Sequence, residues 1–443
     1  MLFRFSKFGT AAAMQTDLRS HGLWERTAPP APYAEALYST IDTDVVIIGA
    51  GYTGLSAALH LAQAGYAPVV VEAAQIGFGG SGRNVGLVNA GMWVKPEDFP
   101  GVLGPIYGQR LLTLLGQAPD LVFDVISAHA IACEATRVGT LHCAPDERGL
   151  SDLTERTRQW ARWGAPVSLL GAQETARLIG SCDYKGALLD RRAGTVQPLA
   201  YARGLADAAI GAGARIFVNS PVTGMMQSGD RHIIDTPRGQ VRAAKVIVAT
   251  NAYSTGPFAA ISDSLAPLPY FNVATAPLSP SMRARILPEG HGAWDTRSVL
   301  SSFRMDAAGR LVFGSVGGLG RWDAAVHRDW ARREVTRLFP QLAGVDFETE
   351  WSGSIGVTAT RLPRLHRLAP GVVAMAGYNG RGIAPGTAFG RVLADMTAGH
   401  TPDSELPLPV MNLPEPDALR GLRGLIYAVG SGLRHFAGAR RPR

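Results

Sequence analysis

The clearest pattern of apolar and polar positions lies in residues 44–77 and predicts two strands joined by a helix. Residues 45–48 form a continuous apolar run, which is typical of a parallel strand with both faces covered. Residues 53–64 place four apolar side chains on one side at helical spacing, and Gly65 ends the helix. Residues 67–71 form a second buried strand. The pattern therefore predicts one strand–helix–strand unit of a parallel sheet.

The turn between the first strand and the helix, residues 49–54, has the sequence GAGYTG, a GxGxxG pattern. Gly49 allows the tight turn, Gly51 lets a pyrophosphate approach the backbone, and Gly54 lets the helix pack on the strand. The helix N-terminus offers free N–H groups and partial positive charge to phosphates. Glu72, at the end of the second strand, is placed to bind ribose hydroxyls and to repel a 2′-phosphate. A dinucleotide site that disfavours NADP is predicted.

Two later segments are typical of further parts of the same domain. Residues 213–254 predict a strand, a hairpin around 228–230 and a last strand at 245–249, and residues 371–399 predict a strand, a glycine-rich turn and a closing helix. A nicotinamide enzyme normally needs one fingerprint followed by a contiguous catalytic domain. An extended FAD held at several points along its length explains three separated segments better.

The predicted fold is α/β: a Rossmann-like FAD-binding domain with a central parallel sheet, interrupted by a mixed-sheet α+β substrate domain. Residues from about 92 to 200 have mainly helical patterns, and from about 255 to 350 strand-like runs alternate with turns. The predicted division is an N-terminal extension at 1–40, an FAD-binding domain at 41–91, 200–255 and 351–400, a substrate-binding domain at 92–199 and 256–350, and a basic C-terminal tail at 401–443.

A glycine-rich loop, residues 77–91, carries an arginine and an asparagine side by side within the sequence GFGGSGRNVGLVNAG. Missing side chains let a ligand approach the backbone. The glycines are therefore expected to admit a flat ring system, to which Arg83 and Asn84 supply positive charge and hydrogen-bond donors. The alternative is an arginine that merely caps the loop.

Several segments together resemble the D-amino-acid-oxidase-type family of FAD-dependent amine and amino-acid oxidoreductases, and most of all the branch containing γ-glutamylputrescine oxidoreductase. They are GLWERTAPP, IGAGYTGLSAALHLAQAGY, GFGGSGRN, VIVATNAYS, WSGSIGVTATRLPRL and AGYNGRGIAPGTAFGR, spread in the family's order over roughly residues 23–399. The SGRN element and the closing glycine turn are the most specific. The resemblance implies the family's fold, which is like that of D-amino-acid oxidase (DAO) and glutathione reductase.

The resemblance also implies cofactor contacts. Ser81 and Arg83 would lie along the pyrophosphate and isoalloxazine, Asn84 near the reactive edge of the flavin, and Val222 would present its backbone to the adenine. The closing turn would point backbone N–H groups at the N1/C2=O end of the ring. The full predicted set is Gly49, Gly51, Tyr52, Thr53, Gly54, Glu72, Ala73, Gly80, Ser81, Arg83, Asn84, Val222, Ala249, Thr250, Gly380, Arg381, Gly382 and Ile383.

The closing turn departs from the family pattern, because this chain has Arg381 where the branch usually has histidine. The substrate or acid–base contacts of the branch therefore do not transfer to this turn. A fixed arginine near flavin N1 would favour the anionic reduced ring. No cysteine lies in the C-terminal half of the chain, which removes the ligand that some relatives use for covalent flavin. Non-covalent FAD is predicted.

The resemblance implies oxidation of a C–N bond in a small amine or amino acid. Hydride passes from the carbon beside the nitrogen to flavin N5, the imine hydrolyses, and electrons go to O2 or another acceptor. Because flavin performs the difficult step, the protein is expected chiefly to bind the neutral amine and orient its carbon. The ten histidines form no HxxH or HExxH arrangement, so no metal site is predicted, and His366 is more typical of a surface residue.

The predicted catalytic or substrate contacts are Asn84, Arg304, Tyr270 and Trp351. Arg304 lies in a strand-like run and is a natural anchor for a carboxylate, although a pairing role on a sheet surface explains it equally well. Tyr270, Phe271 and Trp351 suit an apolar wall for the substrate, and core packing explains them equally well. An anchor role predicts that Arg304→Ala raises KM for a carboxylate-bearing substrate far more than for a plain amine.

The net charge of +7 is concentrated at the C-terminus. Residues 420–443 contain six arginines and no acidic residue, and the remainder is close to neutral. Because phosphate binding needs distributed cations, no nucleic-acid partner is predicted. The tail is either a basic amphipathic segment in weak contact with a membrane or an acidic partner, or a frayed soluble end.

The cysteines favour a reducing, cytoplasmic setting. Cys133, Cys143 and Cys182 have no CxxC spacing and an odd count, which suggests neither a zinc site nor a disulfide framework. No apolar run approaches the roughly 18 residues of a membrane-spanning helix. The N-terminus mixes basic residues into a short apolar run, so the alternatives there are a weak signal peptide and a true start at Met14.

Three rival functions stay open at this level. The first is a flavin dehydrogenase that passes electrons to a membrane quinone or another acceptor. The second is a flavin domain acting on modified tRNA, against which the neutral body argues. The third is a flavin-binding sensor or scaffold without catalytic activity.

Overall fold

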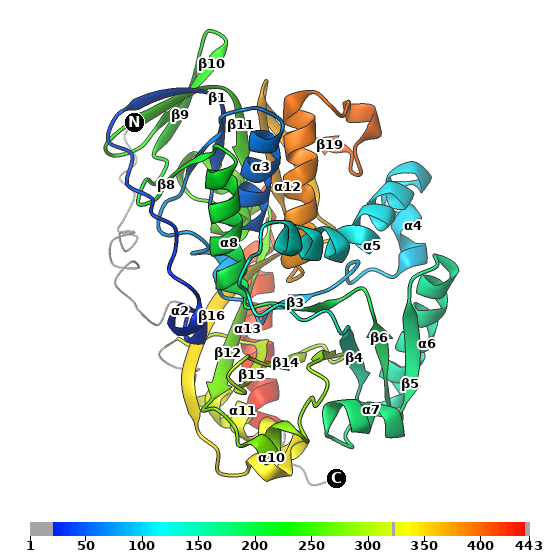
Figure 1. Ribbon diagram of the computed structural model, residues 1–443. Coiled ribbons are helices and arrows are strands. Elements are labelled where there is room, and N and C mark those ends of the chain that lie inside the picture. Colours follow the sequence, from blue (N-terminus) through cyan, green and yellow to red (C-terminus); the bar gives the residue numbers. More distant parts are fainter. Residues whose placement is uncertain (1–20, 321–323, 439–443) are drawn as a thin grey trace.

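The protein is described by a computed structural model over residues 21–320 and 324–438, with two main sheets placed one above the other (Figure 1). The upper, nine-stranded sheet runs in the order β19–β17–β18–β11–β1–β2–β8, and a β9–β10 hairpin pairs with β11. The strands from β18 to β8 along this path are parallel to one another. Their bounds are β1 (Thr40–Ile48), β2 (Val69–Val71), β8 (Arg215–Phe217), β9 (Gly224–Ser228), β10 (Arg231–Asp235), β11 (Gln240–Val248), β17 (Arg364–Ala369), β18 (Val372–Ala376) and β19 (Val410–Met411).

Helices cover one face of the upper sheet, where Val45 and Ile47 of β1 join them in one large apolar core. Val46 and Ile48 point to the opposite face and belong to a second core. This alternation explains the continuous apolar run in the sequence, because both faces of the strand are buried. The covering helices are α3 (Tyr52–Gln63), α4 (Phe99–Leu103), α5 (Pro105–Ala128), α8 (Pro198–Gly211) and α12 (Ile383–Ala398).

The lower, eight-stranded sheet runs in the order β16–β12–β15–β14–β13–β4–β6–β5. Its strands are β4 (Thr140–Ala144), β5 (Val167–Gly171), β6 (Gly186–Asp190), β12 (Ala266–Thr275), β13 (Gly292–Asp295), β14 (Ser301–Met305), β15 (Leu311–Val316) and β16 (Phe347–Val357). The helices around it are α6 (Glu147–Arg162), α7 (Ala172–Ile179), α10 (Pro280–Arg283), α11 (Ala324–Leu338) and α13 (Arg420–Ala437), whereas α9 (Ala259–Asp263) packs into the second core of the upper sheet. A small sheet of β3 (Leu87–Val88) and β7 (Gly194–Thr195) lies between the two main sheets.

The predicted strand–helix–strand unit is confirmed as β1, α3 and β2, with the helix beginning one residue earlier than expected. The later segments also match their predictions. The hairpin is β9–β10, the last strand is β11, and the closing strand and helix are β18 and α12. These elements could be predicted from the sequence because the turns that bound them are short and rich in glycine.

The prediction that residues 92–200 are mainly helical is incomplete, because this block also supplies three strands of the lower sheet. All five residues of β4 and all five of β6 are buried. A strand buried on both faces has no alternation of apolar and polar positions, so its period could not separate it from a helix.

The predicted domain boundaries need correction at two places. Helix α5, placed in the substrate domain, packs against α12 within the core of the upper sheet. Residues 351–357, placed in the FAD-binding domain, are part of β16 at the edge of the lower sheet. Apolar helices and long strands carry no sequence mark of the sheet that they join, so only tertiary packing assigns them. The proposed start at Met14 lies outside the described residues.

Helix α5 is, among the described residues, the one helix long and apolar enough to cross a membrane. Of its most apolar stretch of 18 residues, 44% is buried inside the protein. Leu111, Leu112 and Leu115 lie in the upper core. These contacts are those of a core helix.

The short helix α2 (Leu23–Thr27) is held to the body by Glu25, and this contact predicts a pH-dependent stability. The carboxylate lies 3.3 Å from His21 Nδ1 and accepts a 2.5 Å hydrogen bond from Arg203. The hydrogen bond from His21, with help from Arg203, lowers the pKa of Glu25 to about 2. The stabilisation is therefore complete above the unfolded-state value of about 4.5 and is lost as pH falls through about 2. We expect Glu25→Gln to cost about 1–2 kcal/mol at pH 7 in urea unfolding and about half as much at pH 3.

Candidate active site

The turn between β1 and α3 leaves its backbone open to a ligand. Gly49 has a φ of +104°, and a Cβ on Gly54 would lie 1.9 Å from the carbonyl oxygen of Gly49. The N-cap residue of α3 is Gly51, which has no side chain to cap the helix, and the first turn of α3 holds no acidic residue. The Tyr52 N–H donates to Ser81 Oγ at 3.1 Å. The remaining first-turn N–H groups have no helical partner, which suits an anionic group such as a pyrophosphate.

A second helix begins beside the first. Helix α12 follows β18 just as α3 follows β1, and the parallel strands bring both N-termini to the same edge of the sheet. The N-cap residue Gly382 offers no capping side chain, and the first turn of α12 is also free of acidic residues. The helices touch where Gly386 faces Thr53, whose hydroxyl lies 2.7 Å from the Tyr378 hydroxyl.

Three segments far apart in sequence meet at this edge. The Ala249 N–H donates to Ile48 O at 2.9 Å, and the Gly377 N–H donates to Asn251 Oδ1 at 2.9 Å. A Cβ on Gly49 would lie 3.3 Å from the Thr250 side chain. The edge therefore joins the turns after β1, β11 and β18, as the sequence predicted.

Glu72 is partly exposed at the end of β2, beside the exposed Ala73. Its carboxylate accepts hydrogen bonds from the N–H groups of Ala50, at 2.7 Å, and Ala74, at 3.0 Å. These bonds fix the carboxylate next to the glycine turn. Val222 is partly buried in the core on the opposite face of the sheet from the helices.

In the loop 77–91, the Asn84 side chain differs from its predicted role. The Asn84 amide donates to Gly80 O and Ser81 O at 3.0 and 2.9 Å, and its oxygen accepts from the Gly86 N–H. The carboxamide therefore braces its own loop rather than pointing donors at a ring. The guanidinium of Arg83 lies 4.5 Å over the Phe78 ring.

The lower sheet supports this loop through the carbonyl oxygen of Arg83. Asn272 Nδ2 and Trp351 Nε1 each donate to it at 3.0 Å. Asn272 and Trp351 are paired across β12 and β16, so their side chains share the face directed at the upper sheet. Trp351 is 2% exposed and packs edge-on against Trp24 at 5.5 Å. The predicted substrate wall at Trp351 is thus a loop support.

The same face continues across the sheet to an aromatic pocket. Asn272 pairs with Gly314, Gly314 with Ser302, Ser302 with Trp294, and Trp294 with His142. Directly paired residues point to one side, so this row forms the floor beneath the closing turn.

Arg381, in the closing turn, extends its side chain over this floor. Its guanidinium lies 4.7 Å from the Trp294 ring and 5.0 Å from the Trp93 ring, and Nη1 donates to Ala90 O at 2.8 Å. Trp93 is fixed in turn by a 2.6 Å bond from Nε1 to Asn379 O. The His142 ring stacks on Trp294 at 3.3 Å. A small cavity lies among Arg381, Trp294 and His142.

The charges around this cavity are predominantly positive. Burial lowers the pKa of Arg381 to about 9, and repulsion from Arg156 acts in the same direction. Arginine still keeps its proton at neutral pH, so a buried cation remains. The nearby Asp190 is already paired with Arg192 at 2.6 Å. Burial, with Arg156 and Arg381, holds the pKa of His142 well below its usual value, so its ring is neutral.

Tyr270, Phe271 and His366 occupy positions that the sequence could not distinguish. Tyr270 lies on the face toward the upper sheet, and its hydroxyl lies 2.7 Å from Ser302 Oγ. Phe271 points the other way into the core with Trp330. His366 is buried, against the expectation of a surface residue, and its Nδ1 lies 2.7 Å from Asn412 O.

Arg304 does not suit the predicted anchor role. Its side chain is 3% exposed, hydrogen-bonds to the carbonyl oxygens of Val196 and Met305, and lies 3.8 Å from Glu134. We therefore expect Arg304→Ala to lower stability by about 2–4 kcal/mol in thermal or urea unfolding, because buried acceptors lose their donor. The KM values of a carboxylate-bearing and a plain amine should change by the same factor. A selective rise for the carboxylate would restore the anchor role.

Trp93, His142, Arg156 and Trp294 were missed by sequence reasoning. No motif marks them, since they come from a loop, β4, α6 and β13. The one available signal was Arg381, whose departure from the family pattern pointed at a changed pocket.

The fold and site together define a flavin-dependent oxidoreductase. The chain belongs to the FAD-dependent oxidoreductase (DAO) family, whose description matches residues 44–396. It is 34% identical over 383 residues to γ-glutamylputrescine oxidoreductase of Escherichia coli (strain K12), covering 83% of this chain and 86% of that protein. It is 31% identical over 389 residues to the protein named "Probable oxidoreductase OrdL" from Rhizobium meliloti (strain 1021), covering 86% of this chain and 89% of that protein.

Solved structures share the fold. The crystal structure of glycine oxidase from Geobacillus kaustophilus has a TM-score of 0.67 and 21% identity, covering 81% of this chain and 95% of that one. The cofactor is FAD, bound non-covalently. The uncapped helix N-termini and glycine turns described above fit it. The protein is an oxidoreductase that acts on the C–N bond of an amine or amino acid.

Proposed function

We propose that the substrate is an amine carrying a carboxylate, which Arg381 binds in the aromatic pocket. The observation that carries this proposal is a buried guanidinium, 9% exposed, with no carboxylate of residues 21–320 and 324–438 within ion-pair distance. A buried cation without an anion is costly. A substrate carboxylate supplies the missing charge through paired hydrogen bonds.

Two further polar atoms support a bound substrate at this place. Within the described chain, His142 Nε2 and Trp294 Nε1 are buried and have no hydrogen-bond partner. Buried polar groups are normally satisfied, so both are available to a polar group of the substrate. Trp93 and Trp294 supply apolar walls that hold the carbon chain and exclude water. Because His142 is neutral, it adds no repulsion to a bound amine.

In this account the turn at residues 49–54 holds the pyrophosphate, Glu72 the ribose, and the start of α12 the flavin end of the cofactor. When bound, FAD accepts the hydride that leaves the carbon beside the nitrogen. Arg381 fixes one end of the substrate and thereby orients its C–N bond. Water then hydrolyses the imine to a carbonyl compound and a free amine or ammonia.

The test is an anaerobic screen of amines and amino acids that monitors loss of flavin absorbance. Each carboxylate-bearing amine is compared with the same compound lacking the carboxylate. We expect reduction at least about 10-fold faster at equal concentration for the carboxylate member, which corresponds to ~1.4 kcal/mol. Equal rates would remove the proposal. Admitting oxygen afterwards identifies the acceptor class, because slow reoxidation favours the dehydrogenase alternative.

A cytoplasmic location is also part of the proposal. It is supported by the cysteines, since Cys133 and Cys143 are buried, Cys182 is exposed, and all three are free thiols. Thiols that stay reduced are typical of a reducing compartment.

A further inference from the structure

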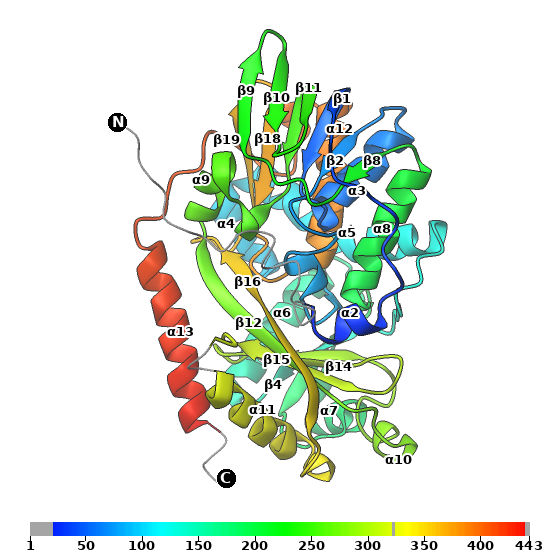
Figure 2. The ribbon, with the colours of Figure 1, turned by 90° about the vertical axis from the view of Figure 1, so that its left-hand side faces the viewer.

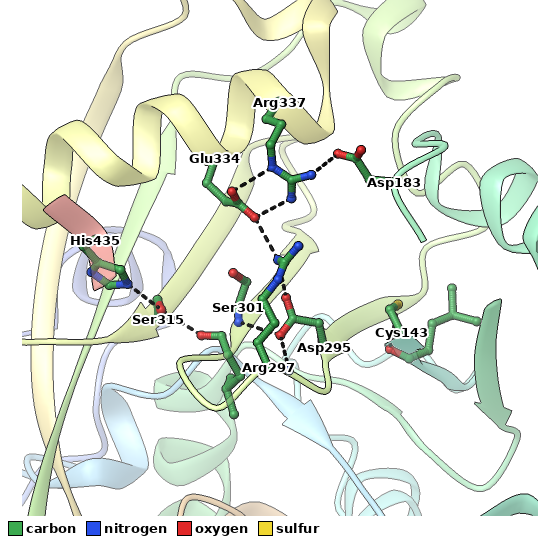
Figure 3. Close-up of polar contacts among 11 residues, drawn as sticks. Cys143, Asp183, Asp295, Arg297, Ser301, Ser315, Glu334, Arg337 and His435 are labelled. Atoms are coloured by element: carbon green, nitrogen blue, oxygen red, sulfur yellow. Dashed lines mark hydrogen bonds and ion pairs between the residues drawn. The ribbon is translucent and has the colours of Figure 1, made fainter. Parts of the chain in front are cut away.

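Helix α13 lies against β12 and α11 at the lower sheet (Figure 2). Ser431 and His435 are its buried residues. The His435 ring stacks on Trp330 at 3.7 Å, and its Nδ1 lies 2.7 Å from Nδ1 of His327. On the other side, His435 Nε2 lies 3.4 Å from Ser315 Oγ of β15, as Figure 3 shows. The helix is therefore a fixed element and not a frayed end.

Ion pairs and hydrogen bonds hold both ends of α13. At the start, Arg420 pairs with Asp263 of α9, and Arg423 with Asp417 at 2.7 Å. At the end, Arg333 of α11 donates to the carbonyl oxygen of His435 at 3.0 Å. These contacts fix the rotation of the helix about its axis, and hence which side chains face outward.

The outward face is apolar along its whole length. Seven large side chains at helical spacing are each 50–66% exposed, and we call them the outer stripe: Leu419, Leu422, Leu425, Ile426, Val429, Leu433 and Phe436. At 100° per residue they fall on one side of the helix, opposite Ser431 and His435. A contiguous exposed apolar surface of this kind marks an interaction site.

The charge around the outer stripe is positive. Arg423 and Arg434 lie along one flank of it, and the exposed Arg434 has no ion-pair partner within the described part of the chain. The sequence has no acidic residue after Asp417, and three more arginines follow at 440, 441 and 443, outside the described residues.

We propose that α13 binds an anionic lipid surface, with the outer stripe in the interface and the arginines at the phosphate headgroups. A long apolar face flanked by cations is typical of a helix that lies in the membrane plane. A second copy of the chain fits less well, because two stripes packed together would bring arginines against arginines. This binding is independent of the substrate proposed for Arg381.

The test is co-sedimentation of the FAD-loaded protein with lipid vesicles. We expect binding to phosphatidylcholine vesicles containing about 30% phosphatidylglycerol, little binding to pure phosphatidylcholine, and weakening at about 0.5 M NaCl. Ile426→Glu combined with Val429→Glu should reduce binding at least about 10-fold. Ile106→Glu is the matched control, because Ile106 is 63% exposed at the start of α5, away from α13, and its replacement should leave binding unchanged.

Flavin content and melting temperature of the double variant should equal those of the wild type, since the replaced residues face outward. The proposal is overturned if the wild type does not sediment with anionic vesicles, or if the double variant sediments equally well. It is also overturned if the wild type is a dimer that the double variant converts to a monomer and no vesicle binding occurs. That outcome would show that the outer stripe binds a second copy of the chain.

Discussion

Replacing Arg381 with methionine should lower kcat/KM for a carboxylate-bearing amine by about 100- to 1,000-fold, or ~3–4 kcal/mol. Methionine keeps the apolar stem of the side chain and removes the guanidinium, which lies over the Trp93 and Trp294 rings and is the part expected to bind a carboxylate. For the same amine without its carboxylate, kcat/KM should change by less than about 5-fold. Steady-state rates on both compounds give the ratio of the two kcat/KM values, which shows whether Arg381 acts on the carboxylate.

Two controls separate this effect from a general loss of function. Arg367→Met removes an exposed arginine paired with Asp403 and should leave both rates unchanged. Arg381→Lys retains a charge but loses the planar fork, so it should recover only part of the affinity for the carboxylate. If Arg381→Met impaired both compounds equally, the arginine would act on the fold or the cofactor and not on the substrate.

Gly51→Val should yield a folded protein that no longer binds FAD. Gly51 has a φ of −91°, which valine adopts without strain, so the backbone need not change. A Cβ there would lie 2.9 Å from Ser81 Oγ, at the entrance to the free N–H groups of α3. We expect the Kd for FAD to rise at least about 100-fold, or ~2.7 kcal/mol, because the branched side chain keeps the pyrophosphate from the backbone.

Absorbance near 450 nm measures the bound flavin after purification, and far-ultraviolet circular dichroism checks the fold. The matched control is Gly211→Val at the end of α8, where a Cβ meets open space. It should purify with a full complement of FAD. Full FAD content in Gly51→Val would contradict the placement of the pyrophosphate at this turn.

The cofactor edge was predictable because each of its parts is determined locally. A glycine in the turn after β1, an uncapped helix start and an acidic residue after β2 each leave a mark within a few residues of sequence. The family resemblance then joined the turns after β11 and β18 to the same ligand. Gly54 is the sharpest example, since any side chain there would collide with the carbonyl of Gly49.

The substrate pocket was not predictable, because it depends on register across the lower sheet. His142 and Trp294 lie far apart in sequence and meet only because β4 pairs with β13. Arg304 was placed correctly on a strand, but the partner of its side chain, the carbonyl oxygen of Val196, is set by tertiary packing. The bond from Trp351 to the carbonyl oxygen of Arg83 is set in the same way. A sequence pattern predicts which face of a strand a side chain lies on, but it does not predict which residue the side chain contacts there.

The most direct test of the central claim is a crystal structure of the FAD-loaded protein with a carboxylate ligand that cannot be oxidised, such as benzoate. The account predicts FAD extended from Glu72 to the start of α12, and the ligand carboxylate hydrogen-bonded to the Arg381 guanidinium between Trp93 and Trp294. A carboxylate bound elsewhere with Arg381 still facing Ala90 alone, or a flavin ring that does not border this pocket, would contradict it.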